Sequence, residues 1–236
     1  MATITESTLI KGVQIVEPQA FGDSRGTFIE TYRREWFPLG REMLQGNRGD
    51  RQAGCIVGNE VNAHWEWYNL GNATRAEVVA DYLRTVRITH TAVRKSSAHA
   101  RVYLSLTHYW DRVMRSGPLR SCEGRGLIDD FNRLARAGGD FDWHLAQHPY
   151  PENLFEPRTW LDKQPTSRED TPKITFKNLE VLDAYFRRAE MLYQGKPRRI
   201  ILSEQGFHCP DKPDGELWQA AAYCYAWKKV TSLAGI

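Results

Sequence analysis

Two hydrophobic patterns follow one another along the chain. From Leu9 to Pro18 the sequence alternates, which is typical of a β-strand that ends at a proline. A turn rich in Gly and Asp covers 21–26, and a β-prone run covers 27–32. These patterns predict a short β-hairpin arm, and the polar stretch 33–54 predicts a loop.

From Cys55 onward, short apolar runs alternate with stretches of helical spacing. The apolar runs predict strands at 55–58, 101–106, 141–146 and 199–203. Apolar residues that recur three and four positions apart predict helices at 74–93, 127–135, 178–193 and 217–230. Four βα units in series predict an α/β fold with a parallel sheet, which is half of a (β/α)8 barrel.

Composition narrows the classes of protein to which the chain can belong. Hydrophobic residues make up 41% and charged residues 26% of the 236 positions, as in ordinary globular domains. A formal charge of +3 is too balanced for a dedicated nucleic-acid binder, so we expect no nucleic-acid partner. No apolar run approaches a membrane span and the first residues lack the order of a secretion signal, so we expect no membrane association and a cytoplasmic location.

Neither the cysteines nor the histidines have the spacing of a metal site. The four cysteines form no C-x-x-C pair, which predicts free thiols. The seven histidines show no metal-ligand spacing, and the stretch 124–126 (GRG) lacks the third glycine of a dinucleotide-binding loop. We therefore expect no metal and no cofactor.

Candidate chemistry lies at the carboxyl ends of the predicted strands, where the loops of a parallel α/β fold converge. Glu60 follows the first strand and Glu204 follows the fourth. A retaining glycosidase needs two carboxylic groups about 5 Å apart, of which one protonates the leaving oxygen and the other attacks the anomeric carbon. Glu60 and Glu204 are therefore the candidate catalytic residues. Each glutamate taken alone is also compatible with an ordinary surface or helix-capping role.

The surroundings of the two glutamates suggest different roles for them. Glu60 precedes an aromatic-rich loop, whose partial desolvation of the carboxyl group would raise its pKa and keep it protonated as the general acid. Glu204 would then be the nucleophile. Indole faces suit the apolar faces of pyranose rings, and polar groups can hold sugar hydroxyls. The candidate substrate-binding residues are Asn59, Trp65, Trp67, His108, His148 and Tyr150.

Several motifs resemble a domain-of-unknown-function family of bacterial barrels that is similar to the large clan of retaining glycoside hydrolases. The motifs are 58–65 (GNEVNAHW), 140–144 (DFDWH), 148–151 (HPYP) and 202–207 (LSEQGF). The resemblance covers 56–236 and implies that Asn59 and Glu60 end the fourth strand of the barrel, with Glu60 as acid/base. It also implies that Glu204 ends the seventh strand as nucleophile, and that His148 and Tyr150 lie where such enzymes position the nucleophile.

Under this resemblance, the chain contains strands four to seven and lacks the remainder of the barrel. Because open edges of a parallel sheet expose unpaired backbone groups, we expect a partner to cover them, and self-association through these edges is one such arrangement. The truncation also predicts that hydrolytic activity is weak or absent.

The first part of the chain resembles a different family, the cupin-type dTDP-4-dehydrorhamnose 3,5-epimerases. The similar stretches are 12–18 (GVQIVEP), 21–30 (FGDSRGTFIE) and 45–48 (QGNR), within 8–57. The resemblance implies that Arg25, Phe28 and Glu30 belong to an arm that helps to bind the sugar nucleotide across a dimer. The chain lacks the catalytic histidine of that family, because it reads GNEV at 58–61.

These observations predict two domains and favour one function over two others. The domains are an epimerase-like β arm and loop over 1–55 and a glycosidase-like partial barrel over 56–236, joined near 56–58 as in a fusion. The favoured function is retaining hydrolysis of a β-linked saccharide. The alternatives are a carbohydrate-binding module without turnover and a fragment related to the epimerases.

Overall fold

The computed structural model describes residues 3–6, 14–17, 20–23, 26–29 and 54–236. Near the N-terminus, strand β1 (Thr3–Glu6) pairs with β2 (Gln14–Glu17), and β3 (Ala20–Asp23) pairs with β4 (Gly26–Ile29), both antiparallel. We predicted one hairpin with a turn over 21–26, but residues 20–23 form a strand, in which Phe21 is paired with Phe28. The prediction of a turn at these positions is therefore wrong. Arg25, Glu30 and most of the predicted loop lie outside the described residues.

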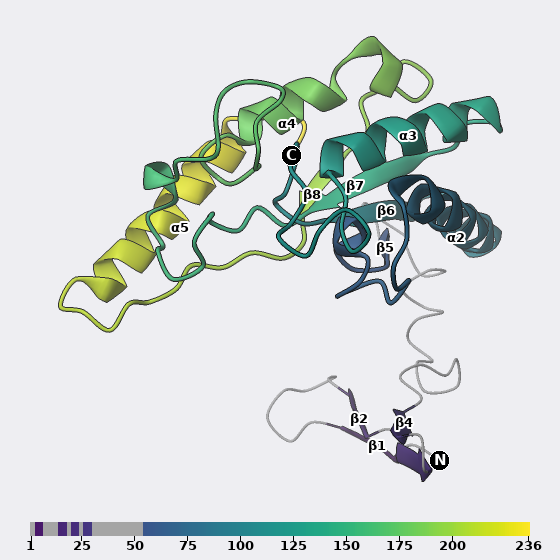
Figure 1. The fold of residues 1–236 in the computed structure, drawn as a ribbon, viewed down its shortest axis with the longest axis horizontal. Helices are drawn as coiled ribbons and strands as arrows, with labels where there is room; N and C mark the ends of the chain where they lie inside the picture. Colours follow the sequence, from purple (N-terminus) through teal and green to yellow (C-terminus); the bar gives the residue numbers. More distant parts are fainter. Residues whose placement is uncertain (1–2, 7–13, 18–19, 24–25, 30–53) are drawn as a thin grey trace.

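A four-stranded, all-parallel sheet organises the chain from residue 54 onward (Figure 1). Its strands, in spatial order, are β5 (Gly54–Val57), β6 (Arg101–Leu106), β7 (Trp143–Gln147) and β8 (Ile200–Leu202). Each is followed by one α-helix: α2 (Arg75–Ser96), α3 (Gly124–Ala137), α4 (Leu179–Phe186) and α5 (Gly215–Thr231). Short 3-10 turns occur at η2 (Val61–Ala63), η3 (Thr159–Leu161) and η4 (Ala189–Met191). The predicted α/β fold with four βα units is confirmed.

A local signal accounts for the start of α2, whereas the end of α4 depends on the tertiary structure. Thr74 caps α2 through a reciprocal pair of hydrogen bonds with Glu77, which is the capping-box arrangement. Helix α4 ends at Phe186, well before the predicted end at residue 193. The backbone leaves the helix at Arg188, which is extended, and beyond it the carbonyl of Glu190 accepts hydrogen bonds from Asn132 and Arg136 of α3. Tertiary hydrogen bonds therefore override the helical periodicity at this point.

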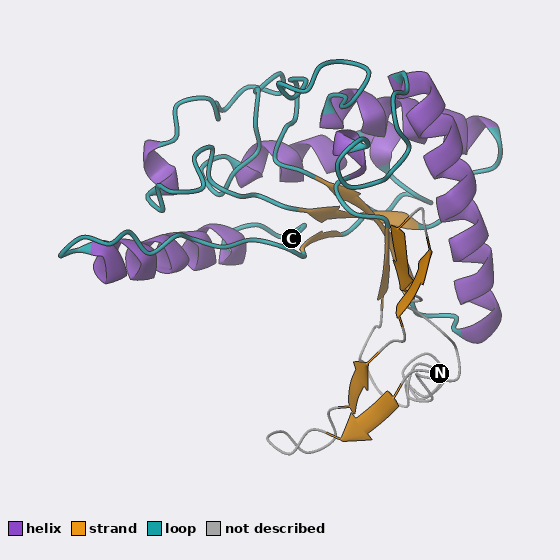
Figure 2. Cartoon of the chain, turned by 60° about the horizontal axis from the view of Figure 1, so that its bottom comes forward, coloured by secondary structure: helices purple, strands orange, loops and turns teal. Residues whose placement is uncertain are grey.

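Within the core, one aliphatic row crosses the sheet in register. Val57, Leu104, Leu145 and Ile200 are neighbours on successive strands, and all four are buried. They belong to the same core as the inward faces of the helices, and both ribbon views show α2 and α3 packed against the sheet (Figures 1 and 2). Burial of this row stabilises the sheet and fixes where its strands end.

The outer edge of β8 is partly covered by the chain itself. The N–H of Ile200, which points away from β7, donates a hydrogen bond to the carbonyl of Gly235 at 3.2 Å. Fewer backbone groups on this edge are therefore free to pair with a second chain. Self-association through the sheet edges stays a prediction. Among the described residues, no helix combines the length and the apolar character needed to cross a membrane.

Removal of the central side chain of this row should be costly. We expect Leu104→Ala to lower the free energy of unfolding by about 2–5 kcal/mol, because it leaves a cavity in the core. Urea denaturation monitored by tryptophan fluorescence measures this change. The matched control is Leu154→Ala, since Leu154 is 55% exposed and should change stability by less than about 0.5 kcal/mol. Equal effects of the two substitutions would contradict this description of the core.

Candidate functional site

Three candidate residues meet at the carboxyl edge of the sheet. Glu60 lies shortly after β5, His148 directly follows β7, and Glu204 lies shortly after β8. Parallel strands end at the same edge, so side chains that are far apart in the sequence become neighbours there. The structure thus brings together the two predicted catalytic glutamates and two of the predicted binding residues, His148 and Tyr150.

His148 lies between the two carboxylates. Its Nδ1 atom is 3.0 Å from Oε1 of Glu60 and 3.7 Å from Oε2 of Glu204. One ligand-type atom of each of the three residues lies within 4.8 Å of the others. His148 is buried, whereas the side chains of Glu60 and Glu204 are 14% and 49% exposed. The pair therefore has one sheltered and one open carboxylate.

The backbone around Glu60 is held in an unusual conformation. Glu60 has φ 42° and ψ 50°, in the left-handed region that is costly for residues other than glycine. Its N–H donates to Oγ of Ser105 at 2.9 Å, which ties the loop to β6. The next turn is held by Asn62, whose side chain donates to Oγ1 of Thr107 and accepts from the Thr107 N–H. Hydrogen bonds from β6 and from Thr107, which directly follows it, thus maintain the strained position of Glu60.

The two oxygens of Glu204 face different partners. The hydroxyl of Tyr150 donates to Oε1 at 3.2 Å, while Oε2 faces His148. Burial, and next the charge of Glu204, raise the pKa of Tyr150, so that its hydroxyl keeps its proton and acts as a donor. Both oxygens of Glu204 are therefore oriented, one by the Tyr150 hydroxyl and the other toward His148.

The ring of His148 is compatible with both protonation states of Glu60. Its Nε2 atom lies 3.1 Å from Oγ of Ser203, a hydroxyl that can donate or accept. When Glu60 is ionised, Nδ1–H donates to the carboxylate and Nε2 accepts from Ser203. When Glu60 is protonated, the carboxyl group donates to Nδ1 and Nε2–H donates to Ser203. A carboxyl group that must alternate between acid and base can therefore keep its hydrogen bond in both states.

The remaining predicted site residues lie at varying distances from this centre. Asn59 directly precedes Glu60 and is half-buried. Trp65 and Trp67 are 40% and 55% exposed, and the guanidinium of Arg120 covers one face of Trp65 at 4.3 Å. Within the described part of the chain, no hydrogen bond or ion pair joins either tryptophan to the two glutamates.

In the part of the chain that the structure describes, the contacts of His108 hold loops together and do not involve the two glutamates. Its ring stacks on Tyr109, and its carbonyl accepts a hydrogen bond from the N–H of Ile174 in the loop before α4. Burial, together with the positive charge of Lys173, lowers the pKa of His108 to about 3, so its imidazole is neutral at ordinary pH. It connects two loops above the sheet, and no ion pair links it to the glutamates among the described residues.

Two serines belong to the site but were not among the predicted residues. Ser105 holds the backbone of Glu60, and Ser203 contacts the ring of His148. A signal for Ser105 exists in the sequence, because it is a polar residue within the otherwise mainly apolar strand 101–106 and is fully buried. Ser203 lies next to Glu204 in the motif LSEQGF, but its role depends on where β7 ends, which the sequence does not reveal.

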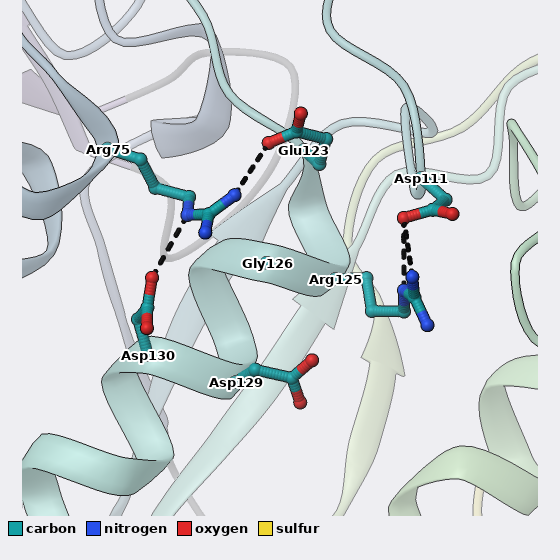
Figure 3. Close-up of a pocket in the computed structure, with 7 residues that line it drawn as sticks. All are labelled: Arg75, Asp111, Glu123, Arg125, Gly126, Asp129 and Asp130. Carbon is teal, nitrogen blue, oxygen red and sulfur yellow. Dashed lines mark hydrogen bonds and ion pairs between the residues drawn. The ribbon is translucent and has the colours of Figure 1, made fainter.

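A separate hollow of about 270 Å³ lies between the starts of α2 and α3 (Figure 3). Arg75 is paired there with Glu123 at 2.9 Å and Asp130 at 3.0 Å, and Arg125 is paired with Asp111 at 2.9 Å. Both guanidinium groups therefore already have carboxylate partners. We interpret this hollow as an ion-pair network that joins the two helices, and the candidate site is the Glu60, His148 and Glu204 cluster.

The left-handed conformation of Glu60 has a measurable consequence. Glu60→Ala and Glu60→Gly both remove the carboxylate, but only glycine adopts this conformation without strain. We expect the Gly variant to be more stable than the Ala variant by about 1–2 kcal/mol in urea denaturation. The same pair of substitutions at Glu66, which is exposed and has an ordinary φ, should favour alanine instead. An Ala variant of Glu60 as stable as the Gly variant would show that no strain is present.

Comparisons with known proteins identify the family but not the activity. No curated protein and no solved structure matches the chain. A family model described as a family of unknown function (DUF5722) matches residues 45–236. The match begins within the segment 1–55 that was predicted to be an epimerase-like arm, and the resemblances to glycoside hydrolases and epimerases stay predictions. The chain therefore belongs to the DUF5722 family.

Proposed function

We propose that this protein is a retaining glycoside hydrolase that acts on a β-linked saccharide, with Glu60 as acid/base and Glu204 as nucleophile. The observation that carries the proposal is the proximity of the two carboxylates, whose nearest ligand atoms lie within 4.8 Å across His148. Retaining enzymes place their carboxyl groups about 5–5.5 Å apart, whereas inverting enzymes leave about 6.5–9.5 Å for a water molecule. The short separation supports retention.

In the first step, the ionised carboxylate of Glu204 attacks the anomeric carbon while the bond to the leaving oxygen breaks. Glu60 donates its proton to that oxygen, and the product is a glycosyl ester on Glu204. The open side of Glu204 and the orientation of its carboxylate by Tyr150 support the role of nucleophile. The hydrogen bond between Glu60 and Nδ1 of His148, which can persist when Glu60 is protonated, supports the role of the acid.

In the second step, water attacks the anomeric carbon and the ester bond to Glu204 breaks. Glu60 is now ionised and accepts the proton of the attacking water, which restores the starting state. Glu60 must therefore change its protonation state twice in each cycle. The paired donor and acceptor capacity of His148 and Ser203 supports this alternation, because one hydrogen bond to Glu60 persists in both states.

Other residues near the pair would bind the sugar. Asn59 is adjacent to the acid and offers an amide to a sugar hydroxyl, while exposed faces of Trp65 and Trp67 offer stacking surfaces. We assign these contacts to the substrate as part of the same proposal. His148 and Tyr150 are positioning residues in this scheme, because His148 lies against both carboxylates and the hydroxyl of Tyr150 donates to Glu204.

Replacement of the nucleophile tests the proposal. We expect Glu204→Gln to reduce hydrolysis of activated aryl β-glycosides by about 10³-fold or more, because the amide cannot form the glycosyl ester. The matched control is Glu66→Gln, which removes an exposed carboxylate outside the pair and should retain full activity. Near-UV circular dichroism verifies that each variant is folded. Equal rates for Glu204→Gln and the parent protein would refute the assignment, and calorimetric binding of sugar without product release would favour a carbohydrate-binding module.

The proposed chemistry uses only carboxyl groups of the chain. We therefore expect hydrolysis to be unchanged, or increased, after dialysis against EDTA, because Glu60 and Glu204 supply both the proton and the nucleophile. The measurement compares initial rates before and after chelation in the same buffer. Activity that disappears with EDTA and returns with added Zn²⁺ would instead indicate a metal-dependent hydrolase.

A further inference from the structure

We infer that the Glu60, His148 and Glu204 cluster binds a divalent transition-metal ion, and that Zn²⁺ is the ion that fits it best. We infer also that the bound ion blocks the carboxylate pair. Each residue offers one ligand atom: Nδ1 of His148 and one oxygen from each glutamate. Metal binding is a property of the three side chains and does not depend on the proposed hydrolysis. Only its inhibitory consequence rests on that function.

The spacing of the three atoms is close to that of a metal site. Zinc bonds of about 2.0–2.2 Å in a tetrahedron place neighbouring ligand atoms roughly 3.3 Å apart. The two distances from Nδ1 of His148 are 3.0 Å to Glu60 and 3.7 Å to Glu204, and no pair exceeds 4.8 Å. The half-exposed side chain of Glu204 can close the remaining gap, and solvent can supply the fourth ligand.

The surrounding hydrogen bonds already orient the ligand atoms. A metal-binding histidine usually has its second ring nitrogen fixed by a hydrogen bond, and Nε2 of His148 has such a partner in Ser203 at 3.1 Å. With Nε2–H donating to Ser203, Nδ1 presents its lone pair to the cluster. Tyr150 donates to Oε1 of Glu204 and leaves Oε2 facing His148. Ser105 fixes the backbone of Glu60.

The set of donor atoms selects the type of ion. An imidazole nitrogen with two carboxylates suits Zn²⁺ and related transition ions, whereas Mg²⁺ and Ca²⁺ prefer oxygen ligands in larger number. Two carboxylates also offset the charge of a divalent cation. Sequence spacing does not indicate this site, because its members come from the ends of three different strands, and the expectation of no metal was based on spacing alone.

Occupation of the cluster would stop the proposed reaction. An ion bound to an oxygen of Glu60 competes with the proton that the acid must carry, and an ion on Glu204 removes the electron pair needed for attack. Zinc should therefore inhibit hydrolysis in competition with substrate, and EDTA should reverse the inhibition. The same site would thus be active without the ion and inactive with it.

Isothermal titration of the full chain with Zn²⁺ at pH 7, in a buffer that does not chelate metals, tests the binding directly. We expect one ion per chain, a loss of affinity of at least about 100-fold in His148→Ala, and about a 10-fold loss in Ser203→Ala. Glu204→Gln, a conservative change at a half-exposed position, should also weaken binding by at least about 10-fold. The control His208→Ala removes an exposed histidine outside the cluster and should bind Zn²⁺ as the parent does.

Each outcome decides the inference. The inference would be overturned if the parent protein bound no Zn²⁺ at a 100-fold molar excess of the ion over protein. It would also be overturned if His148→Ala and Glu204→Gln each bound Zn²⁺ as tightly as the parent does. Near-UV circular dichroism of each variant separates loss of ligands from loss of folding, and the Glu204→Gln result stands if His148→Ala does not fold. Zinc binding without any glycoside hydrolysis would support the metal site while contradicting the proposed function, so the two failures are distinguishable.

Discussion

In a parallel sheet all strands must end at one edge, and in this chain that requirement brings together residues that are 88 positions apart, as Glu60 and His148 are. The row from Val57 to Ile200 fixes the register of the four strands, and therefore the level at which each strand ends. A shift of one residue in β7 would turn His148 to the other face of the sheet. The chemistry at the edge depends on the packing of the core beneath it.

Buried polar side chains, which are uncommon in protein cores, hold the loop at this edge of the sheet. Ser105 and Asn62 are fully buried, yet each makes hydrogen bonds that fix the loop carrying Glu60. Without these partners, the left-handed conformation at Glu60 would relax and move the carboxylate away from His148. The strain, the buried serine and the histidine bridge therefore form one arrangement, whose common effect is the short distance between two carboxylates.

The sequence was sufficient to predict the elements but only part of the site. Strand 101–106 followed from an apolar run, and the start of α2 followed from apolar residues at helical spacing; both are local properties. The end of α4 could not be predicted, because it depends on hydrogen bonds from α3 to Glu190. Glu60 and Glu204 were identified from their places after strands, but Ser203 became visible only once β7 and β8 were paired. The contact between His148 and both glutamates is likewise a property of the sheet.

The stereochemistry of hydrolysis is the most direct test of the central claim that Glu60 and Glu204 act as a double-displacement pair. Proton NMR spectra recorded during cleavage of an aryl β-glycoside identify the anomer that is released first, before mutarotation. The short separation of the carboxylates predicts initial release of the β-anomer, because two inversions at the anomeric carbon restore its configuration. Initial release of the α-anomer would contradict the account, since it requires a single displacement by water and a wider separation of the two groups.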